Sequence, residues 1–376
     1  MDLKEKNLTV SNDDGSREFN QENTHVYTVK SRQYGNFGAP GNVGPHTRAH
    51  RLPPEDDIRT FMSQKPPDYD WVIEGLEPGQ VGVLHAPPGT GKSMLCLSII
   101  YAVASGTDLF GQWTVSEAGD VLYLYADDDS RDTWRRMYGL EQLNAAAHIP
   151  TLNVVKDRMH MICMTGTPQR LMVSGVGHGS CVAAEPDIEE IARRLQGYVN
   201  PRLLIIDPLI KFHALNENDN NEMHQFFERL IRLARELSIA ILVVHHTGKA
   251  AITNGMGGEQ EAVRGASSIT GAARIDYALM PLGHKQAKAL GIEATESGRY
   301  VVLKTAKINS GPALGRLLLE RSAFGGVLML SGKHTGSPPL QGGGDPKPQQ
   351  KKGRPGGGWG GVAESLEEGV PIDYEE

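Results

Sequence analysis

The stretch VGVLHAPPGTGKSMLCLSIIYAVAS, residues 81–105, decides the fold of this chain, because it joins a short buried strand to an apolar helix through a glycine-containing loop. Gly89 and Gly91 let the backbone turn so that its N–H groups face a phosphate. Lys92 can then bridge the β- and γ-phosphates, and the Ser93 hydroxyl can bind Mg²⁺. The alternative is an ordinary turn, which would not require the lysine–serine pair.

The sequence therefore predicts a site for ATP and Mg²⁺ on this loop. The loop departs from the usual phosphate-loop pattern at one position, where Ala86 replaces glycine, but that position needs only a compact residue. We assign nucleotide binding to Ala86, Pro87, Pro88, Gly89, Thr90, Gly91, Lys92, Ser93 and Met94.

Strand and helix patterns alternate beyond this loop. Continuous apolar runs typical of buried strands are VLYLYA (121–126), RLLIIDPL (202–209) and AILVVHH (240–246). Apolar residues at helical spacing fill 187–199 and 220–238. This alternation predicts an α/β fold with a mostly parallel sheet and helices on both faces. Three later strand patterns, 277–282, 299–307 and 326–330, are expected to form an antiparallel or edge extension.

Acidic and histidine side chains follow these strands, at the carboxyl end where ligands bind in such folds. Asp207 is the candidate to orient Mg²⁺, since a buried carboxylate needs a partner; the alternative is a cap on the next loop. Asp127 is the candidate general base that polarises the attacking water, and a shift of one residue would give this role to Asp128. His245 and His246 are placed to contact the γ-phosphate. We prefer His246 as the sensor, and a structural histidine pair is the alternative.

Composition divides the chain into three parts. Residues 1–50 are polar and predicted to be a disordered tail, 51–332 to be the ATPase domain, and 333–376 to be a Gly/Pro/Lys linker with an acidic end. That end is a candidate docking peptide for another replication protein. Three cysteines without metal-ligand spacing indicate a reducing cytoplasm, and we expect no signal peptide and no membrane insertion.

With these pieces in order, the chain resembles the RecA/DnaB superfamily, and more closely the plasmid RepA-type hexameric replicative helicases and their phage relatives. The resemblance covers roughly residues 70–332. It rests on WVIEGLEPG (71–79), HAPPGTGKS (85–93), DLFGQW (108–113), VLYLYADDD (121–129), LLIIDPL (203–209), HHTGKAA (245–251) and GMGGEQEAVRGASSITGAARIDYAL (255–279).

This resemblance implies a RecA-like core and a ring of six identical subunits with ATP held at their borders. It also implies that the catalytic carboxylate comes from the strand next to the phosphate-loop strand, which identifies Asp127, although the family usually has glutamate there. A neighbouring subunit would supply an arginine finger. Arg274 fits that role best and Arg264 is the second candidate. Relatives also place a lysine of a late strand near the neighbouring subunit's nucleotide, which points to Lys304 or Lys307. Arg136 is a further phosphate-sensing candidate.

Two loops are expected to line the channel of such a ring. The loop 212–222 is acidic and a poor phosphate binder, whereas the glycine-rich loop 248–267 carries Lys249 and Arg264. Six copies of the second loop would contact single-stranded DNA without sequence preference. The net charge of −7 does not favour nucleic-acid binding, but a ring can confine its basic groups to the channel.

The sequence thus predicts an ATP-driven DNA helicase-type motor of plasmid or phage replication. Two other functions stay open. One is a recombination ATPase that forms filaments on single-stranded DNA, and the other is a regulatory ATPase that acts on protein partners.

Overall fold

A computed structural model of the chain describes residues 58–147, 149–167, 171–174, 182–184, 186–247 and 267–334. The predicted tails 1–50 and 333–376 lie outside these residues, apart from the first two positions of the second, and so do loop 248–266 and Arg264. Two compact units are separated at Pro66 and Pro67. The first contains helix α1 (Ile58–Ser63), and the second carries all other described elements.

The second unit is built on a nine-stranded sheet with the order β12-β11-β10-β9-β1-β8-β6-β2-β3. Its strands are β1 (Val81–Ala86), β2 (Asp120–Tyr125), β3 (Met159–Cys163), β6 (Pro201–Asp207), β8 (Ala240–His246), β9 (Ile275–Pro281), β10 (Tyr300–Ile308), β11 (Leu317–Arg321) and β12 (Leu328–Leu330). A small sheet, β5-β4-β7, comprises Val182–Ala184, Met172–Ser174 and His213–Ala214.

The strands from β9 to β3 pair in parallel, and β10, β11 and β12 extend this sheet in antiparallel pairing. The predicted parallel core is confirmed, as is the antiparallel extension for its later strands. The expectation was wrong for β9, which pairs in parallel with β1. A helix, α8 (Ser267–Ala272), precedes β9, so the chain reaches this strand by a crossover and runs in the same direction as β1.

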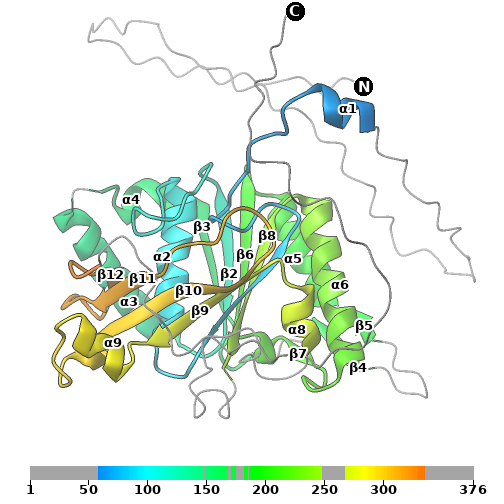
Figure 1. The fold of residues 1–376 in the computed structure, drawn as a ribbon. Helices are drawn as coiled ribbons and strands as arrows, with labels where there is room; N and C mark the ends of the chain where they lie inside the picture. The colour runs from blue at the N-terminus through cyan, green and yellow to red at the C-terminus, as the bar shows by residue number, and fades with distance from the viewer. Residues whose placement is uncertain are drawn as a thin grey trace, which may run out of the picture. The chain divides into compact units, whose positions relative to one another are not determined.

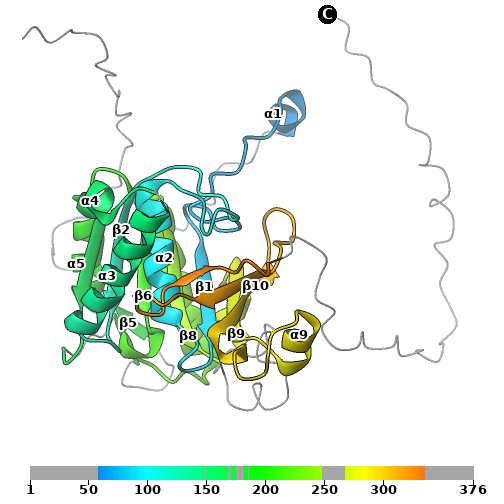
Figure 2. The same ribbon diagram turned by 90° about the vertical axis from the view of Figure 1, so that its left-hand side faces the viewer.

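Helices cover both faces of the sheet, as Figures 1 and 2 show. One face packs against α2 (Lys92–Ser105), α3 (Ser130–Ala146) and α4 (Leu152–Val155). The other packs against α5 (Pro186–Gln196), α6 (Asn220–Leu237) and α8, while α9 (His284–Ala289) lies on the extension. Successive residues of β2 alternate between the two cores, Tyr123 toward α2 and Leu124 toward α6.

The predicted helix 187–199 is shorter than expected. Helix α5 ends at Gln196, and Val199, which we had placed on its apolar face, is 98% exposed. Gly197 lies directly beyond the last helical residue, and its N–H donates to the carbonyls of Arg193 and Arg194, which closes the helix end.

The first predicted channel loop, 212–222, is anchored in the protein. Phe212 is buried, His213 and Ala214 form β7, and the carboxylate of Asp219 caps α6 by accepting hydrogen bonds from the N–H groups of Asn221 and Glu222. This arrangement fixes the loop beside α6, because capping satisfies N–H groups that the first helical turn leaves without partners.

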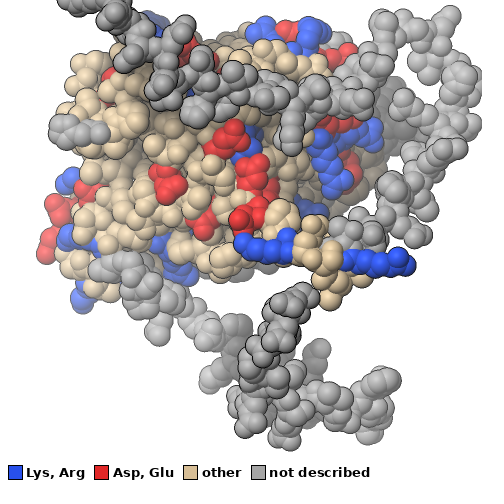
Figure 3. All heavy atoms as spheres, turned by 90° about the horizontal axis from the view of Figure 1, so that it is seen from above, with Lys and Arg blue, Asp and Glu red and all other residues tan. Residues whose placement is uncertain are grey.

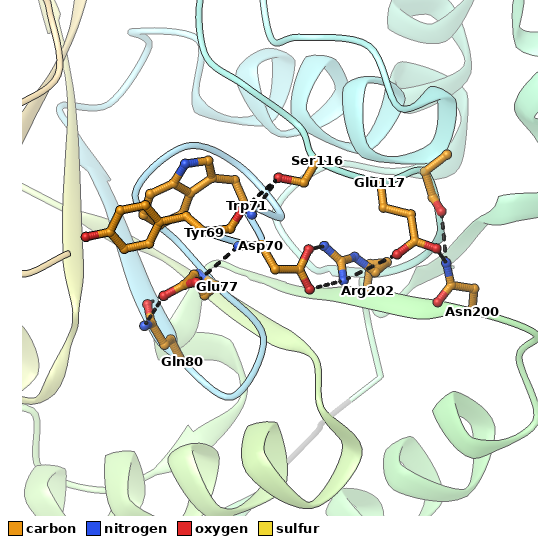
Figure 4. A network of polar contacts seen from close by, with 10 residues as sticks. Tyr69, Asp70, Trp71, Glu77, Gln80, Ser116, Glu117, Asn200 and Arg202 are labelled. Carbon is orange, nitrogen blue, oxygen red and sulfur yellow. Dashed lines mark hydrogen bonds and ion pairs between the residues drawn. The ribbon is translucent and has the colours of Figure 1, made fainter. Parts of the chain in front are cut away.

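A buried arginine fixes the segment that leads into β1 (Figure 4). Arg202, on β6, is nearly inaccessible to solvent and forms two hydrogen bonds to the carboxylate of Asp70. The adjacent Trp71 stacks on Tyr69 with ring centroids 4.3 Å apart, and its N–H donates to the Ser116 hydroxyl at 2.8 Å. Because a charge buried this deeply needs a partner, the Arg202–Asp70 pair holds the entry to the phosphate-loop strand in one position.

Acidic side chains gather in the middle of the face seen in Figure 3. A nucleic-acid backbone is repelled by such a surface, so we do not expect it to bind there. Within the described ranges, no helix is both long and apolar enough to cross a membrane.

Candidate nucleotide-binding site

The loop between β1 and α2 adopts the conformation that its glycines permit. Gly89 and Gly91 have φ angles of +74° and +105°, in the left-handed region that favours glycine. The Thr90 hydroxyl donates to the Pro87 carbonyl at 2.8 Å and braces the turn. Gly91 is the N-cap of α2, and no side chain caps the N–H groups of that helix end. The first turn of α2 therefore presents its N–H groups and its positive dipole end to an anion.

Lys92 lies in this loop with its side chain folded back over the backbone. Its Nζ donates to the carbonyls of Ala86 and Pro87, both at 3.4 Å. Burial lowers the pKa of the lysine, and the nearby carboxylate of Asp207 opposes that shift. A buried ammonium held by two long bonds to neutral carbonyls is poised to bind a phosphate oxygen, which would compensate its charge.

A cavity of about 420 Å³ opens over the loop. Its lining residues are Pro88, Gly89, Gly91, Lys92, Ser93, Met94, Asp127, Asp128, Arg136, Asp207, His246, Arg321, Gly325 and Gly326. The structure thus brings together side chains from the phosphate loop and from the ends of β2, β6 and β8, which are far apart in the sequence. Their convergence follows from the parallel sheet, whose strands all end at one edge.

Asp207 is the most deeply buried acid of this cavity. It is only 4% exposed, and the Tyr123 hydroxyl donates to its Oδ2 at 2.7 Å. Burial raises the pKa of Asp207 to about 6, against the opposing influence of the Tyr123 hydrogen bond and of Lys92. The protein thus keeps a carboxylate whose charge is only partly compensated at the bottom of the cavity, which favours a cation beside it.

We expect Asp207→Asn to stabilise the protein without nucleotide at neutral pH. The folded protein binds a proton at Asp207 more readily than the unfolded chain does, so stability is lost as pH rises from about 4 to about 6. A rise in pKa from 3.8 to about 6 corresponds to roughly 3 kcal/mol at most. Urea unfolding of both proteins between pH 4 and 8 measures this. The gap in unfolding free energy should open as pH rises, and a gap independent of pH would contradict the assignment.

The oxygen-rich side chains of the cavity fit Mg²⁺. Ser93, Asp207 and Asp128 supply a hydroxyl and carboxylates, the ligands that this ion prefers, and Asp207 lacks full charge compensation. No group of three or more His, Cys, Asp or Glu side chains is arranged to hold a metal in the parts of the chain that the structure describes. Mg²⁺ is usually held in proteins by one or two carboxylates together with phosphate oxygens and water.

Two neighbouring acids after β2 differ in their contacts. Asp128 forms a bidentate ion pair with Arg136, whose Nη2 lies 3.0 Å from Oδ1. Burial raises the pKa of Asp128, but the hydrogen bonds from Arg136 and Ser93 outweigh it and the pKa is lowered. Asp127 instead faces His246, with 3.9 Å between Oδ2 and Nε2. Arg136 thus engages Asp128, while Asp127 lines the cavity beside His246.

The sheet order corrects one expectation about these acids. We had placed Asp127 after the strand next to the phosphate-loop strand, but β2 pairs with β6 and β3, and β8 and β6 separate it from β1. The strand adjacent to β1 on this side is β8, which carries the two histidines. Strands that follow one another in the sequence need not be neighbours in the sheet. Here the connection from β1 to β2 leaves the positions between them for β6 and β8, which come later in the chain. Asp127 still reaches the cavity.

The two histidines of β8 point to opposite faces of the sheet. His246 lines the cavity beside Asp127. His245 is almost fully buried on the other side, with Nδ1 3.7 Å from a carboxylate oxygen of Glu217. Because side chains alternate along a strand, only one of the two can enter the cavity, and the structure places His246 there. His245, which we had included among the nucleotide-binding residues, does not line the cavity.

Arg274 lies at the opposite end of the sheet from the phosphate loop of its own chain. Its backbone N–H donates to the carbonyl of Val81, at the start of β1, whereas the loop follows the end of β1. Six residues of strand put roughly 20 Å between them. Arg274 is exposed and lines a different cavity of about 440 Å³, together with Arg235 of α6. It therefore does not reach the phosphate loop of its own chain.

Lys307 has a structural contact that the sequence does not reveal. Its Nζ donates to the carbonyls of Thr270, Gly271 and Ala273, at 2.9, 3.1 and 2.7 Å, and so caps the end of α8. Burial lowers the pKa of Lys307, and Arg274 lowers it further. The lysine thus fixes the segment that carries Arg274. Lys304 lies on the same strand, β10.

Sequence reasoning missed one wall of the cavity. Arg321, Gly325 and Gly326 come from the β11–β12 hairpin, some 230 positions beyond the phosphate loop. The only sequence signal is the arginine followed by a Gly-Gly turn, which is too common to identify a ligand-binding residue.

Comparisons with known proteins place this geometry in context. Residues 46–251 match the family described as AAA domain. Among solved structures, the ATPase domain of G40P is 13% identical, with 68% of this chain and 86% of that chain covered and a TM-score of 0.47. A DnaB-like replicative helicase, solved in a study of its interactions with primase, is 14% identical, with 68% and 58% covered and a TM-score of 0.48. The chain thus spans just over half of the second structure.

Proposed function

Because the chain belongs to the AAA domain family and is a P-loop ATPase with a RecA-like fold, we propose that it is a DNA helicase-type motor of plasmid or phage replication. In this proposal identical subunits form a hexameric ring, ATP is hydrolysed at subunit borders, and the ring moves along single-stranded DNA. The observation that supports it is the separation of roughly 20 Å between Arg274 and the phosphate loop of its own chain, because an arginine finger at this position would act on the nucleotide of a neighbouring subunit.

Each cavity residue has a distinct role in the proposed reaction. The N–H groups of the phosphate loop and Lys92 bind the β- and γ-phosphates. Ser93 and Asp207 would hold Mg²⁺, which would neutralise charge on the phosphates. Asp127 accepts the proton of the attacking water. His246, in contact range of Asp127, registers the loss of the γ-phosphate. Arg274 of the adjacent subunit stabilises charge that develops during transfer.

DNA contact is proposed for the loop that follows β8 in the sequence, because His246 at the end of that strand lines the nucleotide cavity. Lys249 and Arg264 would bind phosphates of the strand without reading its bases. Arg264 and this loop lie outside the described residues.

We expect Lys92→Ala to abolish strand release from a forked duplex while leaving the fold intact. The alanine removes the ammonium that binds the phosphates. Lys92 has no carboxylate within ion-pair distance among the described residues, and Asp207, which loses its favourable interaction with the lysine, keeps the hydrogen bond from Tyr123. Release of a labelled strand in the presence of ATP measures the activity, and Lys211→Ala on the loop after β6 is the control. Strand release by the Lys92 variant at the wild-type rate would contradict the proposal.

Electron micrographs of negatively stained protein with an ATP analogue separate this function from its alternatives. Rings are expected. Filaments on single-stranded DNA would indicate a recombination ATPase. Hydrolysis that is unaffected by single-stranded DNA would instead indicate a regulatory ATPase.

A further inference from the structure

The cavity contains a third cation whose bonding resembles that of Lys92. Arg321, at the end of β11, donates from Nη2 to the carbonyls of Gly89 and Thr90, at 3.1 and 2.7 Å. These carbonyls belong to the phosphate loop itself. No carboxylate lies within ion-pair distance of this guanidinium among the residues that the structure describes, whereas Arg136 is already paired with Asp128.

The position of the guanidinium relative to the helix end points to its ligand. A Cβ built on Gly91 would lie 3.1 Å from Nη1 of Arg321, so this nitrogen stands directly over the N-cap of α2. Two donors of the guanidinium hold the loop, and its fork geometry leaves other N–H groups for an oxygen in the cavity. An anion bound at the helix end would meet both Lys92 and Arg321.

The hairpin is held in place independently of the arginine. Gly139 of α3 lies so close to the hairpin turn that a Cβ there would be 2.7 Å from the carbonyl oxygen of Phe324. Gly325 and Gly326, in the same turn, line the cavity opposite the phosphate loop. The hairpin therefore spans from α3 to the loop and closes one wall of the cavity.

We propose that Arg321 is a phosphate-binding residue of the nucleotide site, supplied in cis by the β11–β12 hairpin. This inference rests on the proposed nucleotide binding. Its ligand class is a nucleoside di- or triphosphate, contacted through oxygens of the phosphate chain. Because the guanidinium binds the loop and the ligand together, it also keeps the loop in its binding conformation.

Titration of the full-length protein with fluorescent ADP and Mg²⁺, followed by displacement with inorganic pyrophosphate, tests the proposal. Arg321→Ala is expected to weaken the binding of both ligands by about ten- to a hundredfold, as for the loss of one charge-assisted contact. Arg321→Lys should recover most of the affinity, because it keeps the charge. Arg193→Ala, an exposed arginine of α5 outside the cavity, should bind as the wild type does.

Two results would overturn the proposal. The first is wild-type affinity for pyrophosphate in Arg321→Ala. The second is a lysine variant as weak as the alanine variant, because a residue that only props the loop needs both carbonyl bonds and not the charge. Thermal unfolding of each variant verifies that it is folded. Failure of the wild-type protein to bind ADP would instead refute the nucleotide site as a whole, so the two failures are distinguishable.

Discussion

Arg274→Ala is expected to lower the rate of ATP hydrolysis by about 10³–10⁵ while leaving nucleotide affinity nearly unchanged. The arginine is exposed and stands roughly 20 Å from the phosphate loop of its own chain, so its removal alters no contact of that loop. The substitution raises the free energy of the transition state and not that of the bound ground state, because the guanidinium stabilises negative charge that develops on the phosphate only during transfer. Steady-state hydrolysis and fluorescent-nucleotide binding measure the two quantities separately.

Arg235→Ala is the matched control, since Arg235 lines the same cavity from α6. If hydrolysis fell only in this variant, the finger would be Arg235.

Mixing two inactive variants offers a second test. When inactive Arg274→Ala and Lys92→Ala proteins assemble randomly into rings, about one interface in four combines an intact loop with an intact finger. Partial recovery of hydrolysis on mixing is therefore expected, and its absence would contradict action between subunits.

Asp127→Asn is expected to reduce the turnover number by about 10²–10⁴, with little change in nucleotide affinity. The amide keeps the size of the side chain but cannot accept the proton of the attacking water. Asp127 approaches only His246 within ion-pair distance among the described residues, so the substitution breaks no paired network. Single-turnover hydrolysis with saturating ATP isolates the chemical step.

Asp128→Asn distinguishes the two adjacent acids. It removes one partner of the bidentate pair with Arg136 and a neighbour of Ser93, so we expect weaker binding of the Mg²⁺–nucleotide complex and a smaller effect on turnover. The opposite result, with turnover lost in Asp128→Asn and kept in Asp127→Asn, would transfer the catalytic role. Asp127→Glu, which introduces the residue typical of the family, should remain active.

The sequence predicts those parts of the fold that local patterns encode. The run 81–105 contains the strand, the loop and the helix in order, and Asp207 follows an apolar run that can only be a buried strand. Edge elements were harder to predict. Strand β3, at one edge of the sheet, carries a weak pattern because every one of its residues is only partly buried.

The site was predictable only as far as each residue belongs to a local motif. Lys92 and Ser93 lie in one such motif, and strand alternation explains why one of two adjacent histidines enters the cavity, but the sequence does not show which. Arg321 belongs to no motif. Its role depends on the β11–β12 hairpin, which forms one end of the nine-stranded sheet. Arg321 contacts the phosphate loop only when the whole domain is folded.

The phosphate loop and the hairpin that closes its cavity lie near opposite ends of the domain's sequence, although they are in contact in the folded protein. Arg321 follows Gly89 by 232 positions. The two strands that flank β1 in the sheet, β8 and β9, are also synthesised long after β1. At synthesis rates of about 5–20 residues per second, a ribosome needs roughly ten to fifty seconds to cover that interval. During this time the nascent chain exposes a finished phosphate-loop sequence without a finished cavity. With Arg321 as a phosphate-binding residue, as proposed, tight nucleotide binding is expected only when translation of the domain is nearly complete.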